Sequence, residues 1–377
     1  MTLSQCRICC SKDVVSKLKK SDFPINIWPS QTGLVPSMEL HIFECAQCHH
    51  VQLQNFNETE IEALYLGDYF NLENSTAHLT RLDLFKQDDN LNTIFQNARL
   101  LDIGGGRNSI IHYVNTELNE STVIDFSIES KVKNQANKAI TGDFLTHSFA
   151  DSSFDIIAAF HCFEHFEQPR VAIEKAFALL SEGGRLLIEV PHGNRVATQM
   201  PYYTYFLQHI SVFTPSSLTR LLENAGFFIE RLYETGQAVF VVARKSTHSS
   251  LSHISRREHK DDTNLFNQSQ LSLNRLETQL LARLQNKEQG IGLYGAGGSS
   301  TLLIFWFPWL ATKIKYAFDM DTQKQGRFIP QTHIPILAPE QLNTQRPQTL
   351  IFHSESVMNS VQIHHDCQRF SLQKLLR

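Results

Sequence analysis

The sequence predicts an α/β protein with two Rossmann-like, doubly wound units behind a small cysteine-rich domain. Strands and helices alternate after residue 98, and a glycine-rich turn follows a predicted strand twice, at Gly104 and at Gly295. The length of 377 residues corresponds to two or three domains. We expect domains over residues 1–75, 76–246 and 247–377.

The composition excludes several classes of protein. Apolar residues make up 42% of the chain and charged residues 19%, so cores can be buried and a disordered chain is excluded. The net charge of −4 argues against a basic nucleic-acid binder. No basic and apolar targeting segment opens the chain, and its most apolar stretch, 302–310, is about half as long as a bilayer span. We therefore expect a cytoplasmic protein that does not bind membranes.

Five of the seven cysteines lie in the first 48 residues. Four of them form two C-x-x-C pairs, Cys6 with Cys9 and Cys45 with Cys48, and a small hairpin can fill the gap of 35 residues. Two such pairs can present four thiolates in the tetrahedral arrangement that structural zinc prefers. The alternative is a set of reduced cytosolic thiols without a metal. Cys10 is expected outside the coordination shell.

The cysteine-rich domain is not expected to bind nucleic acid. Residues 1–75 carry five basic and nine acidic side chains, which is a net charge of −4. A surface that follows a phosphate backbone needs the opposite sign. The short run of lysines over 17–20 is then a solvated face.

The central unit is predicted as a series of strands that end in residues able to bind a ligand. The strand over 98–104 runs into Gly104-Gly-Gly106, where the lack of side chains lets a ligand approach the backbone. The strand over 121–125 ends in Asp125, where doubly wound folds place an acid that binds ribose hydroxyls. Asp143 and Phe144 close a third strand. Each acid by itself could simply be a solvated strand end, and the glycine turn could hold a dinucleotide.

The remaining elements complete this unit and begin another. We expect further central strands over 154–160, 184–190, 228–233 and 237–244, and helices over 169–180 and from Pro215 to near Gly226. A leucine-rich helix follows, which we expect to pack in a core. The C-terminal unit has predicted strands over 291–294, 314–318 and 349–352. Its turn at Gly295 can bind a phosphate through backbone N–H groups, or can simply allow close strand–helix packing.

A loop between the fifth and sixth central strands holds the candidate base. His209 lies in an aromatic stretch just before the helix that starts at Pro215. A histidine in such a setting can accept a proton near neutral pH. The alternative is that His209 only helps to seat this helix.

The central motifs resemble those of class I S-adenosylmethionine-dependent methyltransferases. The matching stretches are 102–106, Asp125, 142–144 and Phe163-Glu-His165-Phe. The resemblance implies that Gly104 and Gly106 face the methionine part of the cofactor, that Asp125 binds the ribose, and that Asp143 binds the adenine amino group. The implied cofactor site comprises Asp102, Gly104, Gly106, Asp125, Asp143, Phe144 and His161.

The chain as a whole is similar to the three-domain nucleotide-sugar C-methyltransferases of deoxysugar pathways. The C-terminal stretches that carry this resemblance are 294–296, 318–330 and 333–341. It implies a class I methyltransferase core between a small zinc-binding domain and a Rossmann-like C-terminal domain that binds the nucleotide sugar. The implied reaction is methyl transfer to the carbon beside the ketone of a nucleotide-linked 4-keto-deoxysugar.

The resemblance also implies roles near His209, with departures. His209 would remove the proton next to the ketone, and Tyr65 and Tyr69 would hydrogen-bond the enolate or else pack between domains. Positions 206 and 208 hold Phe206 and Gln208, where the family often has tyrosine and glutamate. An amide raises the pKa of a neighbouring histidine much less than a carboxylate does. In the C-terminal unit, Ser299 or Ser300 stands where the family usually has a lysine, and His353-Ser354 stands where it has a Trp-Asn pair.

These departures keep other functions open. The first alternative is methyl transfer to an oxygen or nitrogen of a related carrier-linked molecule. The second is a degenerate, non-catalytic nucleotide-sugar-binding protein. A zinc-containing RNA methyltransferase is the third, and the acidic balance of residues 1–75 argues against it.

Overall fold

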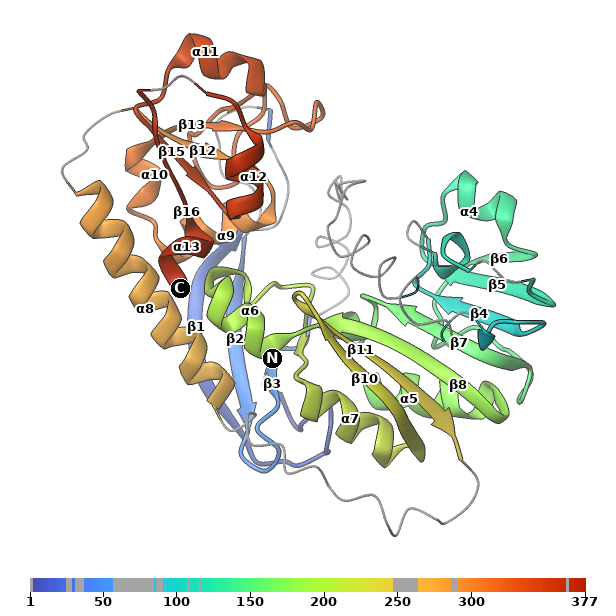
Figure 1. Cartoon of the computed structure of the whole chain (residues 1–377). Coiled ribbons are helices and arrows are strands. Elements are labelled where there is room, and N and C mark those ends of the chain that lie inside the picture. The colour runs from blue at the N-terminus through green and yellow to red at the C-terminus, as the bar shows by residue number, and fades with distance from the viewer. Residues whose placement is uncertain are drawn as a thin grey trace.

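The described residues form three β-sheets, with four, seven and five strands. Figure 1 shows the seven-stranded sheet on one side of the molecule, the five-stranded sheet on the other, and the N-terminal strands near α8. No helix in the described part of the chain is long and apolar enough to cross a membrane. The computed structural model describes residues 3–24, 29–30, 37–56, 85, 91, 93–106, 109–114, 117–246, 264–285, 290–363 and 366–377.

The N-terminal sheet consists of an antiparallel hairpin and two further short strands. Strands β1 (Val14–Pro24) and β2 (Ser37–Cys45) form the hairpin expected between the two C-x-x-C pairs, and β3 (Val51–Leu53) pairs with β2. The fourth strand, β9 (Ser211–Val212), pairs antiparallel with β3. The sequence pattern does not indicate this pairing, because β9 comes from the central part of the chain.

A buried arginine reinforces the junction between β3 and β9. The Nη1 atom of Arg7 donates to the carbonyl oxygens of Leu53 at 2.7 Å and Ile210 at 3.1 Å. The backbone N–H of Arg7 donates to the Gln52 side chain at 2.9 Å. Burial lowers the pKa of Arg7 to about 10, so its side chain remains charged at neutral pH. The Ile210 carbonyl also accepts from the Leu53 N–H at 2.9 Å, so Arg7 adds a second, charged donor at this junction.

The seven-stranded sheet confirms the predicted doubly wound core. Its order is β10-β11-β8-β7-β4-β5-β6, and only β11 runs antiparallel to its neighbours. The chain winds outward from β4 in one direction and from β7 in the other, so the ligand crevice lies at their carboxyl ends. The strands are β4 (Arg99–Ile103), β5 (Glu120–Asp125), β6 (Lys138–Thr141), β7 (Phe154–Phe160), β8 (Leu180–Pro191), β10 (Phe227–Thr235) and β11 (Ala238–Lys245).

Helices and short 3-10 turns connect these strands. The glycine loop leads into the single 3-10 turn η1, which is capped by Ser109. Before α7, Thr214 and Ser217 form a reciprocal capping box, which stops the loop and starts the helix at a defined residue. The elements are η1 (Ile110–His112), α4 (Ser130–Gln135), η2 (Phe163–His165), α5 (Pro169–Leu179), α6 (Gly193–Gln199), η3 (Pro201–Tyr203) and α7 (Pro215–Asn224).

The C-terminal sheet is entirely parallel, in the order β14-β13-β12-β15-β16. Its direction of winding reverses between β12 and β15, which places the Gly295 turn at a second crevice. The strands are β12 (Ile291–Tyr294), β13 (Ile314–Phe318), β14 (Ile336–Leu337), β15 (Thr349–Phe352) and β16 (Gln368–Ser371). The helices are α9 (Gly298–Trp306), α10 (Leu310–Lys313), η6 (Pro339–Gln341), α11 (Leu342–Gln345), α12 (Glu355–Ser360) and α13 (Leu372–Leu376).

Helix α8 (Leu265–Leu284) connects the N-terminal and C-terminal sheets. Four of its leucines are buried in the C-terminal core, as the leucine pattern predicts, whereas Leu271 and Leu281 are exposed; the buried ones are Leu273, Leu276, Leu280 and Leu284. Its first two residues, Leu265 and Phe266, pack in the core of the N-terminal sheet instead. Figure 1 shows α8 running beside β1, and Lys17 of that strand lies 5.2 Å from the Phe266 ring centroid.

Replacing Arg7 with alanine should loosen the β3–β9 junction. Arg7→Ala removes the charged hydrogen bonds to the Leu53 and Ile210 carbonyls, so we expect the opening free energy of these strands to fall by about 2–4 kcal/mol. Hydrogen exchange of the β3 and β9 amides measures this change. Lys19→Ala removes an exposed ion pair with Glu39 and should change the opening free energy by less than about 0.5 kcal/mol. Equal protection in both variants would show that Arg7 does not hold the junction.

Candidate functional site

The four cysteines of the two C-x-x-C pairs converge on one point. The Sγ atoms of Cys6 and Cys48 are 3.5 Å apart, and those of Cys9 and Cys45 are 3.6 Å apart. All four sulfurs lie within 4.8 Å of one another, and none forms a disulfide. Zinc–sulfur bonds of about 2.3 Å place the sulfurs of a tetrahedral site about 3.8 Å apart. The four residues therefore fit a closed zinc site.

The two cysteine turns share one backbone geometry. The N–H of Cys10 donates to the carbonyl of Cys6, and the N–H of His49 donates to the carbonyl of Cys45 in the same way. Cys10 and His49 both adopt left-handed backbone angles, with φ near +59° and +58°. The Cys10 thiol points to Arg170, with Sγ 2.6 Å from Nη1, and so lies outside the cluster of four sulfurs.

The glycine loop after β4 is closely packed on both sides. Gly104 has φ of +76°, and a Cβ atom there would lie 2.9 Å from the Cys162 sulfur. A Cβ atom on Gly106 would overlap the backbone oxygen of Ser127. The Gly106 N–H donates to Asp125 at 2.9 Å. The loop therefore needs glycine at both positions, and its backbone faces the crevice between β4 and β7.

The two acids at the ends of β4 and β5 differ in position. Asp102 is buried beneath the loop, where its carboxylate accepts from the Ser109 hydroxyl at 2.6 Å and the Ile110 N–H at 2.9 Å. Asp102 therefore supports the loop from beneath and does not form part of its outer face. Asp125 lies at the loop surface, and its neighbour Phe126 is 75% exposed. We did not single out Phe126 from the sequence, although its place after the acid was a usable signal.

The residues after β6 include one polar side chain, Asp143, and one buried side chain, Phe144. One oxygen of Asp143 accepts from the Leu145 N–H at 2.9 Å. The Phe144 ring is buried and packs against Phe166, with ring centroids 6.3 Å apart. Lys175 donates to the Phe144 carbonyl at 2.7 Å, which holds this turn against α5. Asp143 is thus partly exposed, while the Phe144 side chain belongs to the core.

His161, directly after β7, lies between two buried carboxylates. Its Nδ1 is 3.3 Å from Glu164 and its Nε2 is 2.9 Å from Glu189. Burial alone would lower the pKa of His161, but the hydrogen bonds to the two carboxylates outweigh burial and raise it to about 9. The backbone of His161 is left-handed, with φ of +51°. Carboxylates of the protein therefore engage both ring nitrogens, although the side chain is 34% exposed.

His209 lies in a cluster of aromatic and polar side chains. It follows η3 and precedes β9, and its ring centroid is 5.0 Å from those of Phe206 and His165. Ligand atoms of Glu164, His165 and His209 all lie within 4.8 Å of one another. Burial, followed by the nearby His165, lowers the pKa of His209 to about 3. The imidazole is therefore neutral at physiological pH, with a lone pair available.

Glu164 and His165 belong to η2, and sequence reasoning quoted them only as part of a motif. His165 Nδ1 lies 2.8 Å from the Gln208 carbonyl oxygen, so this nitrogen carries the proton and donates it. The opposite nitrogen, Nε2, is 4.0 Å from the Glu164 carboxylate. Gln208 itself is buried. Tyr65 and Tyr69, the other predicted catalytic residues, lie outside the described residues.

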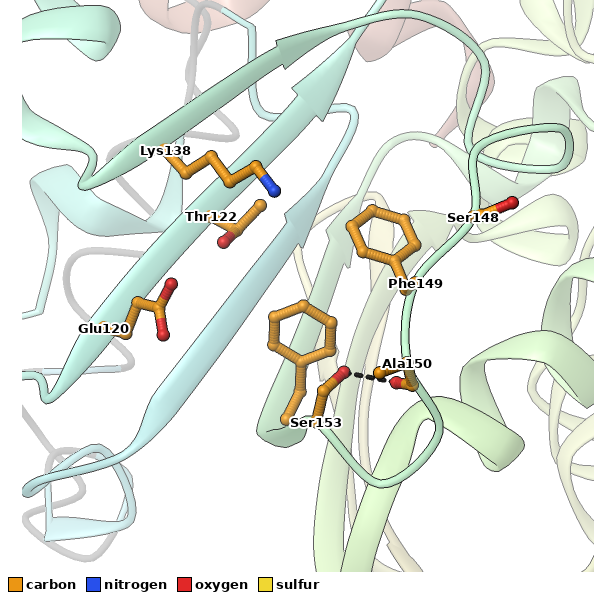
Figure 2. Close-up of a pocket in the computed structure, with 8 residues that line it drawn as sticks. Glu120, Thr122, Lys138, Ser148, Phe149, Ala150 and Ser153 are labelled. Carbon is orange, nitrogen blue, oxygen red and sulfur yellow. Dashed lines mark hydrogen bonds between the residues drawn. The ribbon is translucent and has the colours of Figure 1, made fainter.

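A separate pocket of about 220 Å³ lies at the amino ends of strands in the seven-stranded sheet, away from the glycine loop. It is lined by Glu120, Lys138 and Phe154, the first residues of β5, β6 and β7. Figure 2 shows Lys138 and Thr122 facing the pocket from the sheet, across from Phe149. Because ligands of doubly wound folds bind at the carboxyl ends of the strands, this pocket is not the cofactor site.

The glycine turn of the C-terminal unit is closed by its own side chains. The Ala296 N–H donates to Asp319 at 2.6 Å, so a carboxylate of the protein already occupies a position that a phosphate could take. Ser300 lies 2.7 Å from Nε2 of His353, and the hydroxyl of Tyr202 lies 3.0 Å from its Nδ1. Tyr202 belongs to η3, so this chain of contacts joins the C-terminal unit to the loop that carries His209.

Comparisons with known proteins identify two domains. Residues 80–232 match the methyltransferase domain family, and residues 238–365 match the C-methyltransferase C-terminal domain family. The ubiquinone/menaquinone biosynthesis C-methyltransferase UbiE of Roseobacter denitrificans is 23% identical over 164 residues. That alignment covers 34% of this chain and 66% of the relative, just under two thirds of its length.

Solved structures resemble parts of the fold. The S-adenosylmethionine-dependent methyltransferase from Mesorhizobium loti is 14% identical, with a TM-score of 0.35, and the match covers 43% of this chain and 99% of that one. The PH0226 protein from Pyrococcus horikoshii is also 14% identical, with a TM-score of 0.40, over 51% of this chain and 100% of that one.

The domain matches agree with the strand order and with the glycine loop at the carboxyl end of β4. The predicted class I methyltransferase fold is therefore confirmed, as is the second α/β unit behind it. The chain therefore carries a methyltransferase domain followed by the C-terminal domain of C-methyltransferases.

Proposed function

We propose that this enzyme methylates a carbon beside the ketone of a nucleotide-linked 4-keto-deoxysugar, with His209 as the base. The observation that carries the proposal is the position of the His209 imidazole beside the buried carboxylate of Glu164. Glu164 follows β7, whose carboxyl end adjoins the glycine loop through Cys162. A base at this place lies on the side of the crevice where the methyl donor is expected.

The chemistry requires little more than a base and accurate positioning. S-adenosylmethionine, when bound, supplies an electrophilic methyl group on a cationic sulfur. His209 takes the proton from the carbon next to the ketone, and the two electrons of that C–H bond form the substrate enolate. The enolate carbon then bonds to the methyl carbon as the sulfur–methyl bond breaks.

Glu164 is the proposed positioning residue for this base. An adjacent carboxylate would raise the basicity of His209, but position 208 holds an amide. The buried Glu164 carboxylate raises the pKa of His209 from another element of the fold, although burial still dominates. It also stabilises the imidazolium that forms when His209 accepts the proton.

Residues around the glycine loop are the proposed binding site for S-adenosylmethionine. The backbone of Gly104 and Gly106 would face the methionine part, Asp125 the ribose, and Asp143 the adenine amino group. The exposed Phe126 ring offers a face on which the adenine could stack. Asp102 and His161 would support this site from below, since both are already engaged by neighbouring protein groups.

The four-cysteine cluster is the proposed zinc site, with a structural role. Four thiolates fill a tetrahedral coordination shell, so no position remains for a substrate. Arg7, between two of these cysteines, binds the carbonyl of Ile210, the residue after His209. Zinc would therefore act on the reaction by holding the segment that carries the base.

The C-terminal unit is the proposed place for the nucleotide. Its crevice at β12 and β15 is joined to η3 by the contact of His353 with Tyr202. Because Asp319 already accepts the Ala296 N–H, the diphosphate would need other donors at this edge of the sheet.

A second candidate function is transfer to an oxygen or nitrogen of a related carrier-linked molecule. Phe206 packs against His209 and offers no hydroxyl there, which favours a reaction that needs no enolate stabilisation at this position. Incubation with nucleotide 4-keto-sugars and carbon connectivity of the product by NMR separate the two reactions.

Replacing Gly106 with alanine should weaken binding of S-adenosylmethionine. The added methyl group overlaps the Ser127 carbonyl and displaces the loop, so we expect an affinity loss of about tenfold or more, or about 1.4 kcal/mol. Isothermal titration calorimetry measures it. The matched control is Gly297→Ala, where the added methyl group meets no atom within 4 Å. The loop assignment is wrong if both variants bind like the unmodified enzyme.

Replacing His209 with asparagine should abolish exchange of the substrate's α-proton in deuterated water. Loss of a general base costs about 10²- to 10⁴-fold in rate. Glu164→Gln should slow exchange less, because the base remains while its carboxylate neighbour is lost. The exposed His333 serves as control, and His333→Asn should exchange at the normal rate. Persistent exchange in His209→Asn at the normal rate would exclude His209 as the base.

Removal of zinc should separate catalysis from cofactor binding. Treatment with a strong chelator should lower methyl transfer by about 10- to 100-fold, because the segment of His209 loses its support. Affinity for S-adenosylmethionine should change by less than about twofold, since the hydrogen bonds that hold the glycine loop come from Asp102 and Asp125 of the central sheet. One equivalent of zinc should restore activity. Full activity of the zinc-free protein would contradict this role.

A further inference from the structure

We propose that Glu164, His165 and His209 bind one divalent first-row transition ion, separately from the four-cysteine site. One carboxylate oxygen and two imidazole nitrogens lie within 4.8 Å of one another. Two of these residues are consecutive in η2, and the third comes from the loop before β9. A carboxylate with two imidazoles is a donor set that suits zinc, cobalt, nickel or iron rather than magnesium or calcium.

The orientation of His165 favours metal binding. Its Nδ1–H donates to the Gln208 carbonyl at 2.8 Å, which fixes the ring and leaves Nε2 as the acceptor. Nε2 lies 4.0 Å from the Glu164 carboxylate. Histidines that ligate metals commonly donate their other ring nitrogen to a backbone carbonyl in this way.

The Glu164 carboxylate offers a second, independent indication. The side chain is 1% exposed, and its Oε1 atom contacts His161. Its Oε2 atom is buried and has no hydrogen-bond partner among the residues that the structure describes. A buried carboxylate oxygen without a donor costs free energy, and a bound cation would satisfy it.

Charge and distance also agree with a small cation. The two buried carboxylates Glu164 and Glu189 flank one His161 ring, so a protonated His161 still leaves one negative charge. Metal–ligand distances of about 2.1 Å place neighbouring donor atoms about 3.0–3.4 Å apart. The 4.0 Å between Nε2 of His165 and Glu164 would have to shorten by about 1 Å or less, which side-chain rotation can provide.

Metal binding and the proposed base reaction exclude each other. A ligated His209 has donated the lone pair that proton abstraction requires. Occupancy of this site therefore inhibits methyl transfer, whereas zinc in the cysteine cluster supports it. The binding itself does not depend on the proposed function and can be measured without a substrate.

Cobalt(II) titration of the full-length enzyme with zinc in its cysteine cluster tests the site. We expect one further equivalent of cobalt to bind, with weak visible bands and without the thiolate-to-cobalt charge-transfer band of a cysteine site. His165→Asn removes the Nε2 ligand but keeps an amide that can donate to the Gln208 carbonyl. This variant and Glu164→Gln should each weaken cobalt binding by about tenfold or more. Their retained zinc content and circular dichroism verify that they fold.

The exposed His333 provides the matched control, and His333→Asn should bind cobalt like the unmodified enzyme. The proposal is overturned if His165→Asn and Glu164→Gln bind cobalt with unchanged affinity, or if cobalt enters only by displacing zinc from the cysteines. It is also overturned if no second equivalent binds. Loss of cobalt binding in His209→Asn together with unchanged α-proton exchange would retain the metal site and reject the base.

Discussion

The contacts of Arg7 connect the cysteine cluster with the segment that carries the candidate base. Its guanidinium bridges the carbonyl oxygens of Leu53 and Ile210, and its own position is set by the turn between Cys6 and Cys9. A short strand pair such as β3 with β9 has few hydrogen bonds of its own, so the bonds from this buried charge add to those that hold the loop in place. The N-terminal sheet is therefore joined to the central part of the chain rather than attached as a separate appendage.

The two Rossmann-like units use the same topological feature differently. In the central unit, the loop at Gly104 and Gly106 presents its backbone at the switch point between β4 and β7. In the C-terminal unit, the equivalent turn at Gly295 has its first amide bound by Asp319, and His353 spans to Tyr202. A glycine-rich turn at a strand end is thus a necessary feature of a phosphate site but not a sufficient one, because neighbouring side chains can occupy its donors.

Much of the fold and part of the site could be predicted from the sequence. Strand periodicity located β7 at its observed bounds and most other strands to within a few residues. The doubled C-x-x-C pairs correctly predicted that four thiols would meet, because local turns bring each pair together and only one long-range contact is needed. The functions of Asp125, Asp143 and Gly106 remain predictions from resemblance. Asp102 shows the limit of that reasoning, since its carboxylate supports the loop from beneath.

The sequence by itself determined the order of the domains, the cysteine cluster and the glycine loop, because these depend on local periodicity and short spacings. Only the tertiary structure decided what surrounds His209. Glu164 and His165 are more than 40 residues away along the chain and meet it through the pairing of β9 with β3 and the position of η2 beside that strand. The carboxylate absent at Gln208 is therefore found on another element, since side-chain chemistry in a folded core depends on spatial neighbours rather than sequence neighbours.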